Sequence, residues 1–271
     1  MKHHNIVITN DDGIGSPGLK AAVGAASSLG TVTVVAPSKQ QSGAGRSLFG
    51  DRQSYLMPID YGVNGTAVRA YHCNCSPALV VRHSLRTIFK DTIPDLLIAG
   101  INYGENLGTD ITSSGTVGAA LEAASLGVPS IAISKQTDID SHHAHTHQDW
   151  SASEYFLQKF SKLLLEKKSH PDVQVLKIDV PSDATPSTAW KMTRLAKAPY
   201  YLKDIEKPSA RTKLSHGKTI IQIDATTLDS ETDIHAIAID RMVSVTPLSL
   251  DLSSRVALSD LKASFEPYLP S

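Results

Sequence analysis

The feature that most constrains the fold is the alternation of short apolar runs with helical segments over roughly the first 180 residues. Nearly continuous apolar runs are typical of strands buried on both faces of a sheet, and they occur at residues 5–9, 31–36, 95–100, 129–134 and 173–181. Helical patterns lie between them at residues 16–29, 76–89, 115–127 and 150–167. In two of these segments a serine precedes a proline (Ser16–Pro17 and Ser76–Pro77), a pairing typical of helix starts. The alternation predicts an α/β fold with a doubly wound, mostly parallel sheet.

The sequence changes character after residue 181. Residues 218–223 and 232–248 carry alternating patterns that predict antiparallel strands or hairpins, and residues 258–269 read as a closing helix. We therefore expect an α/β catalytic domain over residues 1–181. A C-terminal hairpin extension with a closing segment is expected over residues 182–271.

Charge and composition exclude several classes of protein. The formal net charge of the 271 residues is −1, which argues against nucleic-acid or membrane-surface binding, since both favour a basic excess. Neither a span long enough to cross a bilayer nor a secretory signal is recognised. The two cysteines, Cys73 and Cys75, exclude a disulfide framework and favour the cytoplasm. They make at most half of a metal site, and two buried small side chains are the better interpretation.

Polar loops follow three of the predicted strands, at residues 9–13 (TNDDG), 37–47 (PSKQQSGAGRS) and 100–116 (GINYGENLGTDITSSGT). Ligands of open α/β sheets bind beyond the carboxyl ends of the strands, so these loops should face one another. Together they offer oxygen donors: Asp11, Asp12, Ser42, Asn102, Asn106 and Asp110. Such donors suit Mg²⁺, Mn²⁺ or Ca²⁺, and a divalent ion would offset the cost of two adjacent carboxylates in a partly desolvated cleft.

The same loops carry features of an anion site. Ser114, Gly115 and Thr116 stand at the start of a predicted helix, where unpaired N–H groups and the helix dipole favour phosphate. The SGAG stretch at 42–45 can turn its N–H groups inward as a nest. Each feature alone is more often an ordinary turn or cap. Their joint placement at consecutive strand ends favours metal-assisted phosphoryl chemistry.

Rival motifs are incomplete. Residues 43–48 (GAGRSL) lack the third glycine of a dinucleotide fingerprint, and residues 216–219 (HGKT) lack the leading glycine of a P-loop. No nucleophile elbow or HExxH motif occurs. Two other classes remain open. The first is a non-catalytic sensor of nucleotide or phosphate, which would keep the anion site but would not need two carboxylates and a metal. The second is an NAD-type oxidoreductase, which the fold alone suggests and the missing fingerprint disfavours.

Four stretches of the chain resemble the survival protein SurE family. They are ITNDDGIGSPGLKAA, VVAPSKQQSGAGRSL, AGINYGENLGTDITSSGTVGAALEAASLGVPSIAIS and MVSVTPLSLDL, spread over residues 5–134 and 242–252. The resemblance implies a Rossmann-like fold with a C-terminal hairpin or arm exchanged between subunits of a homodimer or homotetramer. It also implies a metal-dependent 5′/3′-nucleotidase, a type of enzyme that is also described as an acid phosphatase. Such enzymes hydrolyse nucleoside 5′- and 3′-monophosphates, and some also degrade short polyphosphate.

The resemblance also implies roles for individual residues. The metal ligands of the family fall on Asp11, Asp12, Ser42 and Asn102. The surrounding phosphate-binding motif is matched by Asn10, Asn106, Ser114, Gly115 and Thr116. One divalent cation per subunit is implied, Mg²⁺ or Mn²⁺, which Ca²⁺ can replace in a crystal. The chain departs from the family at Ser113, where tyrosine is usual, and at Leu79, where an acid is usual.

The expected mechanism is hydrolysis with Asp11 and Asp12 as catalytic residues, and with backbone N–H groups of Gly43, Gly115 and Thr116 on the phosphate. One aspartate takes the proton of the attacking water. Attack by a carboxylate itself, giving an aspartyl-phosphate, is the competing route.

Other polar residues near these loops have two interpretations each. The histidines at 142, 143, 145 and 147 either form a solvated loop, the favoured interpretation, or hold an accessory metal. Lys39, Arg46 and Lys135 either meet substrate phosphate or form ion pairs.

Overall fold

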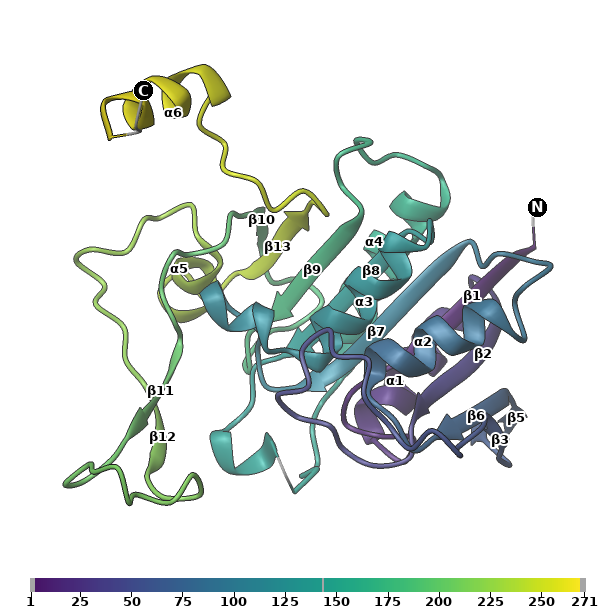
Figure 1. Cartoon of the computed structure of the whole chain (residues 1–271). Coiled ribbons are helices and arrows are strands. Elements are labelled where there is room, and N and C mark those ends of the chain that lie inside the picture. Colours follow the sequence, from purple (N-terminus) through teal and green to yellow (C-terminus); the bar gives the residue numbers. More distant parts are fainter. Residues whose placement is uncertain (1–2, 143, 269–271) are drawn as a thin grey trace.

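A nine-stranded sheet organises the chain (Figure 1), in the order β10-β13-β9-β8-β7-β1-β2-β6-β3. The computed structural model describes residues 3–142 and 144–268. Pairing is parallel except at β13–β9 and β3–β6. The strands are β1 (His4–Thr9), β2 (Gly30–Pro37), β3 (Met57–Pro58), β6 (Arg69–Cys73), β7 (Leu96–Tyr103), β8 (Ser130–Lys135), β9 (Val175–Val180), β10 (Trp190–Met192) and β13 (Val243–Leu248). Because β1 lies between β2 and β7, the order of the strands reverses beside it, which is where open α/β sheets bind ligands.

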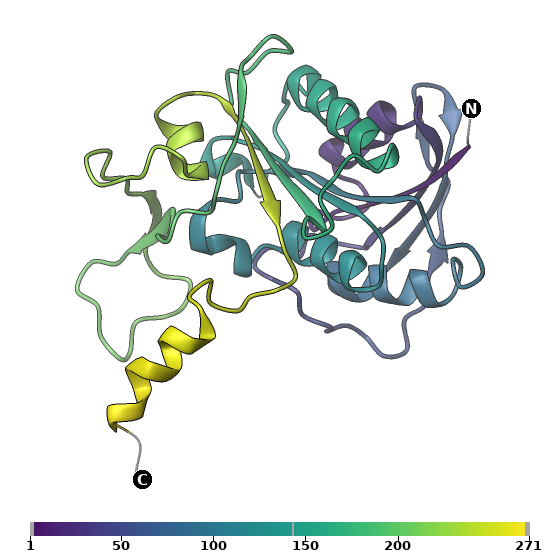
Figure 2. The same cartoon turned by 90° about the horizontal axis from the view of Figure 1, so that it is seen from above.

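Helices cover both faces of the sheet, as the view from above shows (Figure 2). α1 (Pro17–Ala26) and α4 (Ser151–Leu165) contact each other on one face, and α2 (Pro77–Arg86) and α3 (Gly115–Ser125) contact each other on the other. One apolar core lies under each pair. Ser76 caps α2 by accepting from Leu79 N at 3.4 Å, and Ser114 caps α3 by accepting from Val117 N at 3.1 Å. Ser16 stands at the N-cap position of α1, but its side chain makes no capping hydrogen bond. Strands that alternate with helices in the sequence thus form the three-layer sandwich that the apolar pattern predicts.

The predicted strands and helices of the first 181 residues are confirmed, with ends that shift by a few residues. Short elements between β2 and α2 were not foreseen: β3, β6, and the small pair β4 (Gly62–Val63) and β5 (Thr66–Ala67). The 3₁₀ helices η1 (Gly108–Thr112), η2 (Ile139–His142) and η3 (Glu266–Tyr268) were not foreseen either. Two- and three-residue elements give too little pattern to be read from sequence.

The prediction for residues 232–248 is partly wrong. The segment begins as helix α5 (Asp233–Ala238) rather than a strand, because Thr232 caps it by accepting from His235 N at 3.5 Å. Ile234 and Ile237, three residues apart, are both buried, which is a helical spacing. The segment then enters the main sheet as β13 between β9 and β10. The antiparallel expectation holds for β11 (Tyr201–Asp204) and β12 (Lys218–Ile221).

The C-terminal residues extend away from the sheet. The β11–β12 hairpin and α6 (Leu258–Phe265) both project from the body in the two views (Figures 1 and 2). No residue of α6 is buried, and the predicted end of this helix at residue 269 lies outside the described residues. The boundary at residue 181 stays a prediction; the sheet runs across it, since β13 pairs with β9. Within the described ranges, no helix has both the length and the apolar character needed to cross a membrane.

Candidate active site

Three buried polar residues follow the carboxyl end of β1. Asn10, Asp11 and Asp12 are each no more than 6% exposed, although they begin a loop. The turn is closed by Asn10 Nδ2, which donates to Gly13 O at 3.1 Å, and Gly13 adopts a φ of 92°. A Cβ on Gly13 would lie 2.9 Å from the backbone of Lys39, so the loops after β1 and β2 are in close contact. The turn therefore presents both carboxylates at the reversal point of the sheet.

Asp11 faces the first turn of α3. Its Oδ1 accepts a hydrogen bond from the Thr116 hydroxyl, and a Cβ on Gly115 would lie 2.7 Å from the Asp11 Cβ. Burial raises the pKa of Asp11, and hydrogen bonds from Thr116 and from the backbone of Gly115 partly oppose this rise. The backbone N–H groups of Gly115 and Thr116, which the sequence predicts to bind substrate phosphate, are thus directed toward Asp11.

Asp12 is the more strongly perturbed acid. Burial, followed by the charge of Asp11, raises its pKa to about 8. Its Oδ2 accepts from Tyr103 N at 3.2 Å and its Oδ1 from Gln40 Nε2 at 3.1 Å. Asp12 thereby joins the loops that follow β2 and β7.

The loops bring two other predicted donors to the same edge. Gln41 N donates to Asp11 O at 2.7 Å, which places the next residue, the exposed Ser42, at the rim. Gly43 follows it, exposed and with a φ of 77°. Asn102 precedes the residue that bonds Asp12, at an irregularity in the β7–β8 pairing, and its amide nitrogen donates to Gly104 O at 2.8 Å.

Three predicted oxygen donors have partners inside the fold. Asn106 Nδ2 donates to Ser134 Oγ at 2.7 Å, and Ser114 caps α3. Asp110 accepts from Tyr200 N and Tyr201 N, both at 2.8 Å. Asp110 and Ser114 thus accept hydrogen bonds inside the fold, and Asn106 donates one there.

The basic residues of the loops mostly form internal contacts. Arg46 ion-pairs with the buried Glu122 of α3 at 2.9 Å, and Lys135 donates to Ser182 O at 3.0 Å. Lys39 is exposed. At the two positions where the chain departs from the family, Ser113 Oγ donates to Asp110 O at 2.9 Å and Leu79 packs on the core under α2 and α3.

The residues at this edge fit a hard divalent cation. Among the described residues, no Lys or Arg nitrogen lies within 4.0 Å of either carboxylate. Asn10 Oδ1 is buried and has no hydrogen-bond partner in the same part of the chain. Two carboxylates with raised pKa values, beside neutral oxygens, are a donor set for Mg²⁺ or Mn²⁺. A cation bound there would supply the missing positive charge.

The histidine-rich loop lies against the site. Gln40 Nε2 donates to His142 O at 2.6 Å, Tyr103 OH donates to Thr146 O at 3.0 Å, and His145 Nε2 lies 3.9 Å from Asp12 Oδ1. Burial lowers the pKa of His145. No group of three or more His, Cys, Asp or Glu side chains that could hold a metal occurs in residues 3–142 and 144–268, and His143 lies outside them. The loop is therefore packed on the site rather than solvated throughout.

Sequence reasoning missed several residues of the site. Gln40 and the Tyr103 N–H group contact Asp12, and no sequence signal marks either contact. Lys177 and Asp179, behind the loop after β7, could have been found, because two charged residues in an otherwise apolar strand (VLKIDV) are unusual.

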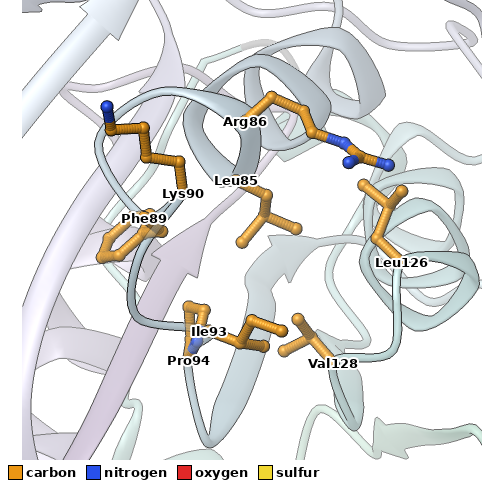
Figure 3. A pocket seen from close by; sticks show the side chains of 8 residues that line it. All are labelled: Leu85, Arg86, Phe89, Lys90, Ile93, Pro94, Leu126 and Val128. Atoms are coloured by element: carbon orange, nitrogen blue, oxygen red, sulfur yellow. The ribbon is translucent and has the colours of Figure 1, made fainter.

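A cavity of about 250 Å³ lies elsewhere (Figure 3). Its lining includes Leu85, Ile93 and Val128, and its charged residues are Arg86 and Lys90. Ile93 and Val128 precede β7 and β8, so the cavity is at the amino ends of the strands, opposite the carboxylates. It offers no carboxylate and does not belong to the candidate active site.

Comparisons with known proteins identify relatives of this chain. The family model described as survival protein SurE matches residues 6–201. The 5'-nucleotidase SurE of Thermococcus kodakarensis is 40% identical over 258 residues, covering 95% of this chain and 96% of the relative. That of Archaeoglobus fulgidus is 38% identical, covering 96% and 97%. The crystal structure of the SurE protein from Aquifex aeolicus superposes with a TM-score of 0.73 at 31% identity, covering 96% of this chain and 99% of that one. The chain therefore belongs to the survival protein SurE family.

Proposed function

We propose that this protein is a metal-dependent phosphomonoesterase that hydrolyses nucleoside 5′-monophosphates to nucleoside and phosphate. The observation that carries the proposal is the pair of buried carboxylates, Asp11 and Asp12, at the reversal point of the sheet, with no lysine or arginine of the described chain paired to either. Membership of a family whose relatives are named 5'-nucleotidase SurE supports the same activity. A phosphate sensor would not need this concentration of buried acid.

We further propose the binding roles within the site. Asp11, Asp12, Ser42 and Asn102 hold one Mg²⁺ or Mn²⁺ ion. When bound, the ion polarises a phosphoryl oxygen and lowers the pKa of a bound water. The N–H group of Gly43 and the α3 start at Ser114, Gly115 and Thr116 receive the remaining phosphate oxygens, with Asn10 and Asn106 behind them. Asp11 accepts hydrogen bonds from Gly115 and Thr116, so a bound phosphate and the Asp11 carboxylate would both lie at the start of α3.

The reaction exchanges one bond to phosphorus for another. A water oxygen bonds to phosphorus as the water loses one proton, the ester bond to the nucleoside oxygen breaks, and that oxygen takes up a proton from solvent. Asp11 or Asp12 accepts the proton that the water loses, since both carboxylates stand at the site. Direct attack by a carboxylate is the alternative. A phosphorylated aspartate trapped during turnover would exclude the water route.

The test of the function is release of inorganic phosphate. We expect turnover of nucleoside 5′-monophosphates with Mg²⁺ or Mn²⁺ and loss of turnover with a chelator. A panel with 3′-monophosphates, p-nitrophenyl phosphate and short polyphosphate defines the substrate range. Nucleotide binding without phosphate release under every metal condition would favour the sensor instead.

We also propose a homodimer or homotetramer built through the C-terminal extension, and a cytoplasmic location. The first is supported by large apolar side chains left exposed there, including Leu252, Leu258, Phe265 and Tyr268. The second is supported by Cys73 and Cys75, which are free and buried.

A further inference from the structure

A lysine without contact to solvent lies behind the loop that follows β7. Lys177, in the middle of β9, has a side chain only 1% exposed. Its ammonium group ion-pairs with Asp179 on the same face of the strand and with Asp233 at the start of α5, the latter at 3.1 Å. It also donates to Asn106 O at 2.8 Å. Three charged side chains from two distant segments thus form one cluster, and its lysine bonds a backbone carbonyl of the site loop.

Both carboxylates hold the same loop. Asp179 Oδ1 accepts from Asn106 N at 2.8 Å, and Asp233 Oδ2 accepts from Gly108 N at 3.0 Å. With the bond from Lys177, residues 106–108 make three backbone contacts to the three charged side chains. Asp233 also accepts from Ala196 N at 2.9 Å, so the cluster ties the loop to the C-terminal half of the chain.

The held loop continues directly into the proposed metal site. Tyr103 N donates to Asp12, and Asn102 stands one residue before it. Asn106 lies three residues beyond Tyr103 and reaches Ser134 at the end of β8. A shift of the backbone at 106–108 would therefore displace Asn102 and the Tyr103 N–H group that donates to Asp12, because only a few residues separate them.

Stability alone does not explain such a cluster. Burial works to lower the pKa of Lys177, but the adjacent Asp179 and Asp233 outweigh it and raise the pKa, so the lysine stays charged. Buried ion pairs recover little net stability after desolvation, and apolar side chains often replace them without loss. What the cluster provides is a fixed geometry for three backbone groups of the loop.

We infer that Lys177, Asp179 and Asp233 are positioning residues that hold the loop at 106–108, including Asn106, and through it Asn102, in the conformation that binds metal and phosphate. This inference rests on the proposed function. None of the three touches the reacting atoms. In metal sites, loss of a side chain that bonds a metal ligand lowers metal affinity or activity by about 10- to 100-fold, and these three side chains support the ligand Asn102 through the loop.

The test compares variants of the full-length protein. Lys177→Met removes the donor to Asn106 O. Asp233→Asn keeps the shape of the side chain but removes its charge, and the amide nitrogen must stand either against Gly108 N and Lys177 or against Ala196 N. Val175→Ala is the matched control, because it removes buried volume from the far end of the same strand. Unfolding temperatures are measured first, so that variants are compared at similar losses of stability.

Two readouts do not depend on turnover. We expect the Mn²⁺ dissociation constant, measured by electron paramagnetic resonance, to rise about tenfold or more in Lys177→Met and Asp233→Asn but not in Val175→Ala. Hydrogen exchange of the Asn106 and Gly108 amides in metal-free protein should accelerate in the same two variants. With nucleotide substrate, KM should rise more than kcat falls.

Equal Mn²⁺ affinity in all three variants and the wild type would overturn the inference. If Lys177→Met does not fold, Asp233→Asn decides alone by the same two measurements. If the wild type releases no phosphate from any nucleotide, the proposed function fails, while Mn²⁺ affinity and amide exchange still decide whether the cluster positions the loop.

Discussion

Asp11 and Asp12 are neighbours with different surroundings. Asp11 receives a hydroxyl hydrogen bond from Thr116 at the start of α3, whereas Asp12 receives one backbone and one amide N–H group from two other loops. Burial raises the pKa of both, and only Asp12 carries the charge of its neighbour as a second cause of the rise. Asp11 therefore also holds a helix in place, while Asp12 links the loops.

Asp11→Asn should abolish metal-dependent turnover. The substitution keeps an oxygen for Thr116 but removes the negative charge that a divalent ion needs. Because such an ion contributes several kcal/mol to transition-state stabilisation, we expect kcat/KM to fall at least about a hundredfold. Phosphate release measured against Mn²⁺ concentration checks this. Asp60→Asn, at an exposed position, is the control. Normal Mn²⁺-dependent activity in Asp11→Asn would refute the ligand assignment.

The stability of the metal-free protein should depend on pH through Asp12. Its pKa is about 8 in the folded chain, against an ordinary value of 3.8, so between these values the folded chain binds more protons than the unfolded chain. Stability from this group is therefore present at low pH and declines as the pH rises toward 8. Metal binding releases the proton, so added Mn²⁺ should raise the unfolding temperature more at pH 8 than at pH 5.

The control for the pH effect is Asp12→Asn without metal. Calorimetric unfolding at several pH values should show a weaker decline toward pH 8 in this variant than in the wild type. Parallel curves for the two proteins would show that Asp12 does not titrate in this range.

The start of α3 packs directly on the turn after β1. Glycine is required at position 115 because a Cβ would lie 2.7 Å from the Asp11 Cβ. The same helix receives the loop after β2, since a Cβ on Gly118 would lie 2.2 Å from Gly45 O. The position of the helix is therefore fixed by close contact of its glycines with the Asp11 side chain on one loop and with the Gly45 backbone on the other.

Gly115→Ala should separate α3 from Asp11. We expect lower Mn²⁺ affinity and about a tenfold or larger fall in kcat/KM, because misplaced groups lose the aligned geometry that catalysis needs. Gly15→Ala, in the turn after β1, is the matched control, since apart from the chain neighbours of Gly15 no atom of the described residues lies within 4 Å of the added carbon. Isothermal titration with Mn²⁺ and phosphate release measure both effects. Similar behaviour of the two variants would contradict this account of α3.

Elements with a long apolar pattern could be predicted from the sequence, and shorter elements could not. The strands and helices of the first 181 residues are recognisable because burial on both faces leaves almost no polar interruption. α5 was missed because Ile234, Ala236 and Ala238 stand at every second position of its six residues, which also fits a strand. In such a short segment, the cap at Thr232 and the tertiary contacts decide.

The convergence of the three site loops followed from sheet topology alone, but their contacts did not. That Thr116 bonds Asp11, or that Gln40 joins Asp12 to His142 O, depends on side-chain directions across segments far apart in the chain. Asn106 and Asp110 show the converse. Both carry side-chain oxygens that suit a site, yet the amide nitrogen of Asn106 donates to Ser134, and the Asp110 carboxylate accepts from the backbone at Tyr200 and Tyr201.

The whole molecule leaves its C-terminal segment with little internal packing. α6 has no buried residue, and Leu258 is 80% and Phe265 59% exposed. Apolar side chains gathered on a projecting helix are unusual for a monomer. They support a second copy of this chain as the surface that covers them.

Leu258→Glu with Phe265→Glu should therefore weaken self-association. The added charges oppose burial of α6 against another subunit but disturb nothing in the sheet. We expect light scattering to show a lower mass for the variant than for the wild type at the same concentration, with little change in circular dichroism. A monomeric wild type would contradict the proposed assembly.

The position of β13 has a consequence for protein synthesis. A nascent chain that has left the ribosome only as far as β9 has an unpaired sheet edge there, because the next strand in space is residues 243–248. Asp233, which contacts both Lys177 and Gly108, also emerges late. A translation product that ends before Asp233 would lack these contacts to the site loop, and it would leave β9 as an exposed sheet edge open to pairing with other chains.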